Sequence, residues 1–424
     1  MDRGAVAFSD PALAPVADKV LHGEPLSAAD GLALYASRDL HGIGRLANFV
    51  RESLHGDRTY YNRNRHINYT NVCALSCKFC SFYRKRGEDG AYEMPVEQVV
   101  ATAVKAAEAG ATEVHVVGGL HPWLKFDYYL DLMRGIRAAA PNLHVKAFTA
   151  IEIIHFTRVA RLTVEQVLTQ LRDAGLGSLP GGGAEIFDDR VHDEVFKGKV
   201  RADKWFDVHR TAHRLGIYSN ATMLYGHVET PAERIGHLIK LRELQAESLR
   251  ECRSANVEVR SEARPPASSF DIRHSHFDIP VGKAAFNCMI PLSFAPEQSE
   301  LGHLPGNTGL TDLKTLAISR LMLDNVPHVK AFWIMQGIGL SQIALNWGCD
   351  DLDGTVVWYD ITKREGGGNT VHQQLHVEDI QRLIREAGRT PVERDTLYRE
   401  VRRDPATGRV LAPADATAEP IAVP

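Results

Sequence analysis

Strand-like and helix-like segments alternate between residues 63 and 375, and this alternation restricts the fold more than any other feature of the chain. In MPVEQVVATAVKAAEAG, for example, Pro95 suits a first helical turn and Gly110 ends the helix before the next apolar run. Alternation of this kind predicts parallel βαβ units. The strand candidates are residues 66–70, 113–117, 144–149, 176–178, 217–224, 286–294, 328–335 and 354–358. Eight such units predict an α/β fold, a closed (β/α)8 barrel of the TIM type.

An open, doubly wound sheet is the alternative arrangement of the same elements. That fold would place a glycine-rich turn directly after the first strand and ahead of a helix. The turn after residues 66–70 instead holds Cys73, Cys77 and Cys80. The barrel is therefore the preferred prediction.

The remaining segments flank or interrupt the predicted barrel core at 63–375. Residues 1–62 have the apolar spacing of short helices, and residues 376–402 predict a helix packed on the barrel. The segment at about 247–283 is dense in charge and has no clean periodicity, which indicates an insertion. The sequence leaves open whether it is a surface loop, a partner site or a reading-frame artefact. Residues 403–424 are rich in Ala and Pro and predict a disordered tail.

Charge and hydropathy exclude several classes of function. Lys and Arg number 49 against 53 Asp and Glu, a net charge of -4, so no basic surplus is present to bind nucleic acid. No run approaches the ~18 apolar residues that a membrane helix needs. The amino terminus also lacks an apolar signal core. We therefore expect a cytoplasmic protein without nucleic-acid or membrane partners, whose cysteines stay reduced.

Three of the six cysteines form a CxxxCxxC cluster, while Cys252 and two others stand alone and are expected to be buried thiols. Zinc is one candidate for the cluster, with His66 as a possible fourth ligand, because structural zinc requires four ligands. A four-iron four-sulfur cluster is the other candidate. It can be held by Cys73, Cys77 and Cys80 alone, which leaves one iron free. A free iron can chelate the amino and carboxylate groups of a methionine moiety and pass an electron to an adjacent sulfonium.

The cysteine segment CALSCKFC, with Phe79 before the third cysteine, resembles the radical S-adenosylmethionine (SAM) enzymes. Within them, the chain from about Asn62 to Tyr398 resembles the aminofutalosine synthases of menaquinone biosynthesis. The motifs that carry this resemblance are NRNRHINYTNVC, KFCSF, EVHVVGGLHP, KAFTAIEI, LPGGGAEIF and SNATMLYGHVET. Each follows or overlaps the end of a predicted strand, where a barrel enzyme has its active site.

The resemblance implies a 4Fe-4S cluster on the three cysteines and SAM as a consumed co-substrate. It assigns cofactor contacts to Phe79 (adenine), Gly118 and Gly119 (methionine amino group), Glu152 (ribose) and Glu185 (adenosyl or substrate pocket). Leu120 stands where the superfamily often has an acidic residue. The candidate substrate residues are His121, Gly182, Gly183, Arg190, Tyr225 and His227. For most of these residues, a packing, turn or ion-pair role is the competing interpretation.

The reaction implied is addition of the 5'-deoxyadenosyl radical to 3-[(1-carboxyvinyl)oxy]benzoate, with loss of carbon dioxide, to give 6-amino-6-deoxyfutalosine. The electron would come from a flavodoxin or ferredoxin. One competitor is cyclic dehypoxanthinyl futalosine synthase, whose pattern favours Gln ahead of the glycine pair where this chain has Val117. An iron-sulfur electron carrier without catalysis is a further alternative. It would leave the other motifs without a role.

Overall fold

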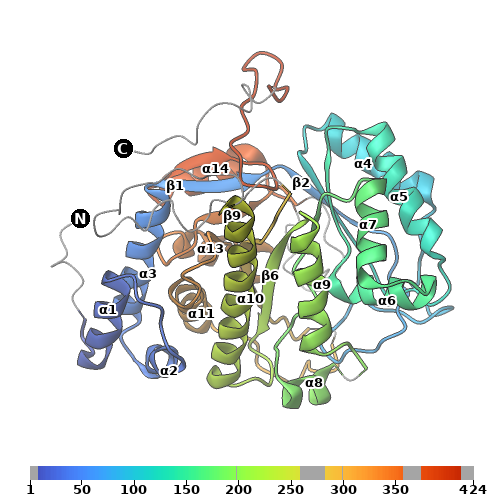
Figure 1. Cartoon of the computed structure of the whole chain (residues 1–424). Helices are drawn as coiled ribbons and strands as arrows, with labels where there is room; N and C mark the ends of the chain where they lie inside the picture. Colours follow the sequence, from blue (N-terminus) through green and yellow to red (C-terminus); the bar gives the residue numbers. More distant parts are fainter. Residues whose placement is uncertain (1–7, 197, 258–281, 298, 357–373, 412–424) are drawn as a thin grey trace.

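The protein is described from a computed structural model, which places residues 8–196, 198–257, 282–297, 299–356 and 374–411. Its centre is a sheet of seven parallel strands that curls into a half-barrel (Figure 1). The strands follow one another in chain order: β2 (Asn64–Asn68), β3 (Glu113–Val117), β4 (His144–Ala147), β5 (Ser178–Leu179), β6 (Tyr218–Tyr225), β7 (Phe286–Ser293) and β8 (His328–Val329). The predicted α/β fold with parallel βαβ units is confirmed.

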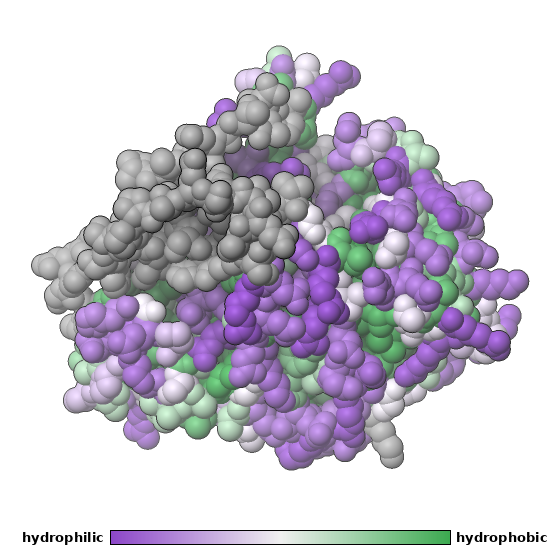
Figure 2. Space-filling model, viewed as in Figure 1, coloured by the Kyte–Doolittle hydropathy of each residue, from purple (hydrophilic) through white to green (hydrophobic). Residues whose placement is uncertain are grey.

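Helices pack around the outside of this sheet and bury their apolar faces against it (Figure 1). They are α4 (Val96–Glu108), α5 (Phe126–Ala139), α6 (Ala150–Ala160), α7 (Val164–Ala174), α8 (Asp189–Val195), α9 (Ala202–Arg214), α10 (Pro231–Val257), α11 (Gly309–Met322), α12 (Trp333–Gln336) and α13 (Ile338–Ala344). The face of the molecule in Figure 2 is mostly hydrophilic, with smaller apolar areas between the helices. No helix in the described part of the chain is long and apolar enough to span a membrane.

Helix α7 shows how local sequence sets these elements. Thr163 accepts the backbone N–H of Gln166, and the Gln166 side chain accepts the N–H of Thr163, so the predicted capping box is present. Leu168 and Leu171 face the core. Gly175 ends the helix at φ 125°, in the left-handed region that favours glycine.

A second sheet, of three parallel strands, lies across the end of the half-barrel where its strands begin (Figure 1). Its order is β10 (Thr390–Glu393), β1 (Arg58–Asn62) and β9 (Asp351–Gly354). The expectation of helices throughout residues 1–62 was therefore wrong at Arg58–Asn62. From residue 8 onward, the helices before this strand are η1 (Pro11–Leu13), α1 (Ala14–Leu21), α2 (Ala28–Ala36) and α3 (Leu40–His55).

The terminal segment also differs from the predicted single helix over 376–402. Helix α14 (Val377–Glu386) ends early, and β10 follows it. The expectation of a disordered tail from 403 was wrong for residues 403–411, because Arg403 forms an ion pair with Glu393 at 2.5 Å and bridges to Val410. The remainder of that tail, residues 412–424, lies outside the described residues.

Two strand predictions and the insertion need correction. Residues 328–335 were expected to be extended, but 333–336 are helical. The predicted strand at 354–358 is β9, which begins at Asp351; residues 357–358 lie outside the described part. The insertion expected at 247–283 begins as a continuation of α10 to Val257, since no Gly or Pro interrupts it there. Residues 258–281 are not among those described.

The segment that contains β9 connects the two edges of the seven-stranded sheet. The backbone N–H of Ala331, just after β8, donates to Asp351 O at 2.9 Å. At the other edge, His66 of β2 donates its backbone N–H to Val356 O at 3.1 Å. A short irregular segment thus stands where the sequence predicted a regular eighth strand.

Candidate active site

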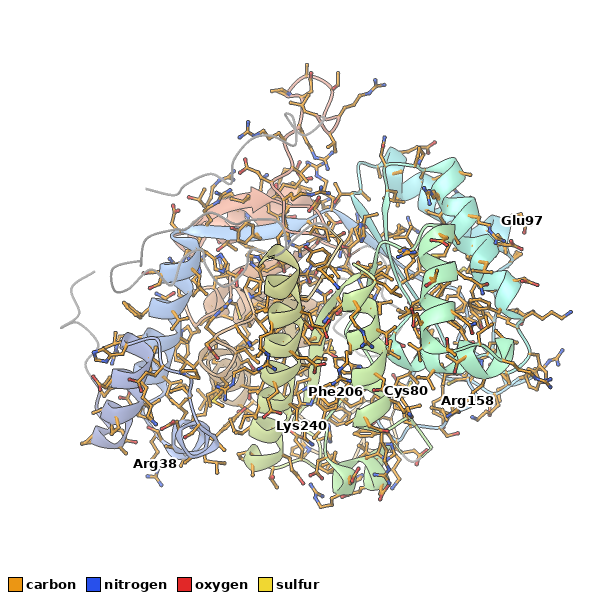
Figure 3. The ribbon with its side chains drawn as sticks, viewed as in Figure 1. Arg38, Cys80, Glu97, Arg158, Phe206 and Lys240 are labelled. Atoms are coloured by element: carbon orange, nitrogen blue, oxygen red, sulfur yellow. The ribbon has the colours of Figure 1, made fainter. Side chains whose placement is uncertain are left out.

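The predicted motifs meet at the carboxyl ends of β2 to β6, the lower part of the molecule in Figure 3, where Cys80 is labelled. The cysteine loop follows β2 and is fixed by backbone hydrogen bonds. Cys73 donates its N–H to Arg84 O at 3.0 Å, and Ala74 donates to Leu120 O at 2.9 Å. The Lys85 ammonium donates to Cys73 O at 3.0 Å. The loop is therefore ordered by the chain itself.

The environment of the three thiols fits an iron-sulfur cluster. Cys73 Sγ accepts the backbone N–H groups of Leu75 and Leu120, each at 3.4 Å, contacts that stabilise a thiolate. Burial raises the pKa of Cys77 to about 11 and also raises that of Cys80, and the positive charge of Lys199 partly offsets this effect at both thiols.

A single zinc ion fits less well. Among the described residues, one group of three ligand side chains lies close enough for a single ion, and it contains none of these cysteines. The cysteine sulfurs therefore do not converge on one ion-sized point, and His66 does not complete such a site. A four-iron cluster is larger and takes ligands that stand further apart.

The group that does converge comprises His55, His328 and Asp350, at the opposite end of the strands. Its polar atoms already have partners within the chain. Asp350 accepts from the Arg320 guanidinium and lies 2.5 Å from His328 Nδ1, and His55 Nε2 is 2.9 Å from Pro327 O. We interpret it as a buried hydrogen-bonded network, not as a metal site.

Gly118 and Gly119 bring the loop after β3 against the cysteine loop. A Cβ on Gly118 would stand 2.7 Å from the Tyr69 ring, and one on Gly119 would overlap the Val72 carbonyl. Gly119 also donates its N–H to Thr70 O at 2.9 Å. The glycines are thus required by packing within the chain, in addition to any contact with a methionine group.

Glu152, at the start of α6, is buried and holds the Gly118 loop in place. Its Oε1 accepts from the Tyr69 hydroxyl at 2.7 Å and from Gly118 N at 3.0 Å. Its Oε2 accepts from the Thr149 N–H at 2.7 Å and the Thr149 hydroxyl at 2.8 Å. Burial raises the pKa of Glu152 to about 7 despite these donors. Both oxygens are thus engaged with groups that shape this loop, and the predicted ribose contact of Glu152 stays a prediction.

The loop after β5 carries the triple glycine and Glu185. The Gly181 carbonyl accepts from the Thr222 hydroxyl at 2.7 Å, and a Cβ on Gly182 would stand 2.9 Å from Thr149. Gly183 has φ 88° and no room for a side chain beside Ile151. Backbone at this loop therefore approaches the loop after β4 closely.

Glu185 has φ 46°, a strained conformation for a residue with a side chain, and its carboxylate forms an ion pair with Lys199. Both side chains are about nine-tenths buried. Burial opposes the charge on Lys199, but the nearby Glu185 and Cys77 outweigh it, so its pKa is raised. The Lys199 ammonium also lies 5.1 Å from the centre of the Phe79 ring.

Lys199 lies outside the sequence motifs that predicted the site. It follows Glu185 by fourteen positions, across a helix, and no pattern joins the two. In space it places a cation beside Cys77, Phe79 and Glu185, three of the predicted site residues. This is the strongest addition that the structure makes to the candidate site.

His121 and Arg190 already have carboxylate partners. His121 Nε2 lies 2.7 Å from Glu93, and its Nδ1 accepts the Leu124 N–H at 3.1 Å. Arg190 is on the exposed surface and pairs with Glu233 at 2.7 Å. Each of these side chains faces a carboxylate of the chain itself, and their roles in substrate binding stay predictions.

Tyr225 and His227, at the end of β6, are buried and engaged with the chain. The Tyr225 hydroxyl donates to Asp312 at 2.7 Å. His227 lies with Nε2 3.1 Å from Leu224 O and Nδ1 3.3 Å from Glu229. Both support the mouth of the half-barrel.

The interior of the half-barrel also contains polar groups from β2, β3 and β4, and of these the sequence singled out only His66, as a possible zinc ligand. The rings of His66 and His115 lie 4.5 Å apart, and Glu113 pairs with Lys146 at 2.9 Å. Burial lowers the pKa of His66 to about 4, which keeps the ring neutral. The signal was available in β2, where polar residues recur at every second position (Asn64, His66 and Asn68).

Comparison with known proteins agrees with this geometry. Residues 67–241 match the radical SAM superfamily, and residues 283–407 match the CofH/MqnC C-terminal region. The chain is 43% identical to aminodeoxyfutalosine synthase of Thermus thermophilus, over 93% of this chain and 97% of that protein. It is 42% identical to the aminodeoxyfutalosine synthase of Streptomyces coelicolor, over 92% of this chain and 95% of that protein. The 5-amino-6-(D-ribitylamino)uracil–L-tyrosine 4-hydroxyphenyl transferase of Methanopyrus kandleri is 36% identical to this chain. The match covers 87% of this chain and 92% of that protein.

Two solved structures share the fold. Methylornithine synthase superposes with a TM-score of 0.63 at 17% identity, covering 89% of this chain and 97% of that chain. The FeFe-hydrogenase maturase HydG from Carboxydothermus hydrogenoformans superposes with a TM-score of 0.63 at 14% identity, covering 91% of this chain and 80% of that chain.

Proposed function

The chain belongs to the radical SAM superfamily and, within it, to the aminodeoxyfutalosine synthase family, and on that premise we propose that it forms 6-amino-6-deoxyfutalosine. The substrates are SAM and 3-[(1-carboxyvinyl)oxy]benzoate. The C5'–S bond of SAM breaks, methionine leaves, and the 5'-deoxyadenosyl carbon bonds to the enol-pyruvyl double bond. Rearrangement follows, and loss of carbon dioxide from the resulting radical releases one electron and leaves the closed-shell product. We propose a cytoplasmic location, where a reduced flavodoxin or ferredoxin can supply the electron.

Cys73, Cys77 and Cys80 would hold the cluster, which supplies one electron to cleave SAM. The chain's own contribution is to hold the reacting groups and exclude water. Two backbone N–H groups on Cys73 Sγ fix that sulfur, and the Lys85 ammonium fixes the carbonyls of the loop.

Glu152 acts in this proposal as a positioning residue for Gly118 and Gly119, which are the proposed contacts of the SAM methionine group. Phe79, half-buried beside Lys199, remains the candidate for the adenine. Glu185 is proposed to lie beside the adenosyl group, with its carboxylate oriented by the lysine.

The benzoate substrate carries two carboxylates, which require a cation within reach. Lys199 is better placed than Arg190 or His121, because its only described carboxylate partner, Glu185, is itself a proposed site residue. Gly182, Gly183, Tyr225 and His227 are proposed to line the same pocket. A SAM or substrate carboxylate would then share Lys199 with Glu185.

One observation carries the proposal: the cysteine loop and the glycine pair form one hydrogen-bonded unit. Leu120, directly after Gly119, donates its N–H to Cys73 Sγ, and Gly118 donates to Glu152. A cluster and the methionine end of SAM would therefore be held at fixed relative positions, as reductive cleavage requires.

The test is anaerobic reconstitution with iron and sulfide, followed by incubation with SAM, a reductant and the enol-pyruvyl benzoate, with mass analysis of the product. The adenosyl group should appear in the product. Free 5'-deoxyadenosine equal to turnover would instead favour cyclic dehypoxanthinyl futalosine synthase. A cluster whose spectrum does not respond to SAM would favour an electron carrier. A parallel incubation with L-tyrosine and 5-amino-6-(D-ribitylamino)uracil should give no turnover.

A further inference from the structure

We propose that the interior of the half-barrel forms the deep end of the substrate pocket, where His66 and His115 bind the ring carboxylate of the benzoate together with one proton from solvent. We call this pair of side chains the His66–His115 subsite. The inference rests on the proposed function and deepens it, since it assigns the second carboxylate of the same substrate.

The two histidines face the inside of the half-barrel. They are directly paired across β2 and β3, and their rings lie 4.5 Å apart. Val114 and Val116 alternate with His115 along β3 and are fully buried in the hydrophobic core. Because successive side chains of a strand point to opposite faces, His115 and its partner His66 project into the interior.

The interior retains space at this level. β3 and β7 each pair with a strand on both sides, so an inward side chain there has accessible surface only within the half-barrel. His115 on β3 and Ile290 and Leu292 on β7 are nevertheless only partly buried. Ile290 and Leu292 alternate with Met289, which is fully buried, and Ser293, which bonds to α11. The space thus has a polar side and an apolar side, as an aromatic acid requires.

The base of this space is covered by the segment that follows β10. The Thr396 hydroxyl donates to Glu113 at 2.6 Å, and the Asn287 amide donates to Thr396 O at 2.9 Å. The Asn220 amide in turn donates to Asn287 at 2.6 Å. These bonds tie the segment to the amino ends of β3 and β7. A molecule bound in the interior would therefore enter from the carboxyl ends of the strands, where the cysteines lie.

The proposed reaction determines which end of the substrate reaches this depth. The enol-pyruvyl double bond must meet the 5'-deoxyadenosyl carbon near the cysteines, so the carboxylate beside it is the one that Lys199 would bind. The ring carboxylate is at the other end of the molecule. His115 precedes Gly118 by three residues and so lies about 10 Å deeper along the strand. The ring would then lie between the histidines and the side chains of Ile290 and Leu292.

The charges of the interior explain why a proton accompanies this carboxylate. The ammonium groups that face the two rings already have carboxylate partners. Lys146 pairs with Glu113 at 2.9 Å, and Lys330 pairs with Asp353 at 2.5 Å. These pairs leave no surplus positive charge for an entering anion. His115 Nε2, in contrast, is buried and has no hydrogen-bond partner among the described residues.

Both rings are neutral before the anion binds. Burial lowers the pKa of His66 to about 4 and holds that of His115 well below its usual value. Glu113 opposes this effect at both rings, and Lys146 and Lys330 add to it. A carboxylate placed against the rings would raise their pKa values, because an opposite charge favours the protonated form. Binding of the ring carboxylate is therefore coupled to uptake of a proton.

The test measures binding without turnover. The reconstituted protein, with SAM and without reductant, is titrated anaerobically in a calorimeter with the enol-pyruvyl benzoate and with 3-[(1-carboxyvinyl)oxy]benzamide, which lacks only the ring carboxylate. Each titration uses two buffers that differ in ionisation enthalpy, so the heats report the protons taken up. The variants are His66→Gln and His115→Gln. His213→Gln is the matched control, since this buried histidine of α9 bonds Ser248 and Ser219 on the outer side of the sheet.

We expect the wild type to take up about one more proton with the acid than with the amide. At pH 6.5 the acid should bind at least about tenfold more tightly than the amide, and this preference should fall by up to about tenfold at pH 7.5. In both subsite variants the preference should shrink to less than about threefold, whereas His213→Gln should keep it. Titration of Glu152 affects both ligands equally, so it cancels in the comparison.

The inference is overturned if the wild type takes up equal numbers of protons with the acid and the amide, or if both subsite variants keep the full preference for the acid. The first comparison uses the wild type alone and does not depend on how the variants fold. Product formed after addition of a reductant is measured separately. Normal product without a preference for the acid would overturn this inference alone, and the expected binding without product would overturn the proposed function alone.

Discussion

Glu152 joins three segments of the chain through one buried carboxylate: Tyr69 after β2, Gly118 after β3 and Thr149 before α6. In Glu152→Gln, one side of the group becomes an amide that cannot accept, so two donors lose their acceptor. We expect a loss of about 1–3 kcal/mol in the free energy of unfolding and weaker SAM binding, with unchanged iron content. Urea unfolding and a SAM titration of the reconstituted protein measure these effects.

The capping box of α7 offers a matched control. Gln166 makes the same two contacts with Thr163 as Glu152 makes with Thr149, but on the exposed surface and far from the glycine pair. Gln166→Ala should cost at most about 1 kcal/mol and leave SAM affinity unchanged. Equal effects of the two variants on SAM binding would contradict the positioning role.

The raised pKa of Glu152 also predicts how stability depends on pH. The folded protein holds this proton up to about pH 7, whereas an unperturbed glutamate has a pKa of 4.5. Between these values the folded state therefore binds more protons than the unfolded state. The contribution of Glu152 to the free energy of unfolding is therefore fully present below the unfolded pKa. It is lost as the pH rises through 7, and the loss amounts to at most about 3 kcal/mol. Tyr69 and Tyr129, which face the carboxyl, have raised pKa values and stay neutral.

The measurement is the difference in unfolding free energy between wild type and Glu152→Gln at pH 5 and at pH 8. The wild type should lose more stability than the variant over this interval. A difference that does not change with pH would show that Glu152 does not titrate there.

Lys199 and Glu185 form a nearly buried ion pair, so removal of either partner leaves a charge without compensation. Lys199→Met should lower the free energy of unfolding by about 3–5 kcal/mol. Lys199→Met with Glu185→Gln should recover most of that loss, because no unpaired charge remains. A double-mutant cycle by urea unfolding checks this; additive losses would contradict the pairing.

At the residue scale, spacing within one loop was predictable and contacts between loops were not. The cysteine spacing and the glycine pair were visible because ligand geometry and backbone freedom leave local patterns. Lys199 was not visible, because its role depends on a turn that returns the chain beside Glu185. Glu152 was identified as a site residue, but its hydrogen bonds to Tyr69 and Gly118 require the packed structure.

Element prediction succeeded where one local pattern was sufficient. EVHVV coincides with β3, and the α7 capping box formed as expected. β1 and β10 were missed because each is short and lies next to a helix, and the partners that make them strands are more than 300 residues apart. The stretch 328–335 was expected to be wholly extended because its apolar run does not distinguish β8 from the helix that follows.

β10 brings with it a buried arginine that secures the second sheet. Arg394 donates to Asp351 of β9 at 2.6 Å and lies 4.2 Å from the centre of the Tyr398 ring. Arg394→Met should cost about 3–5 kcal/mol of unfolding free energy, since Asp351 stays buried without its cation. Arg399→Met, which removes an exposed pair with Asp395, should change stability by less than about 1 kcal/mol. Thermal and urea unfolding compare the two; similar losses would contradict this account.

For the whole molecule, the two ends of the half-barrel have separate tasks. The carboxyl ends of the strands carry the cysteines, the glycine loops and Lys199, and short contacts join Cys73 to Leu120 and Lys199 to Glu185. The other end is covered by the β10-β1-β9 sheet and by the His55, His328 and Asp350 network. Stability variants at the covered end should therefore leave the site chemistry unchanged until the protein unfolds.

The pairing of β1 with β10 has a consequence for biosynthesis. Arg58 aligns with Thr390, so the first strand to leave the ribosome waits for almost the last. Loop closure over such a distance is slow and entropically costly, and β1 keeps an unpaired edge until then. A nascent chain of this protein therefore presents its cysteines long before it can cover the base of its own sheet.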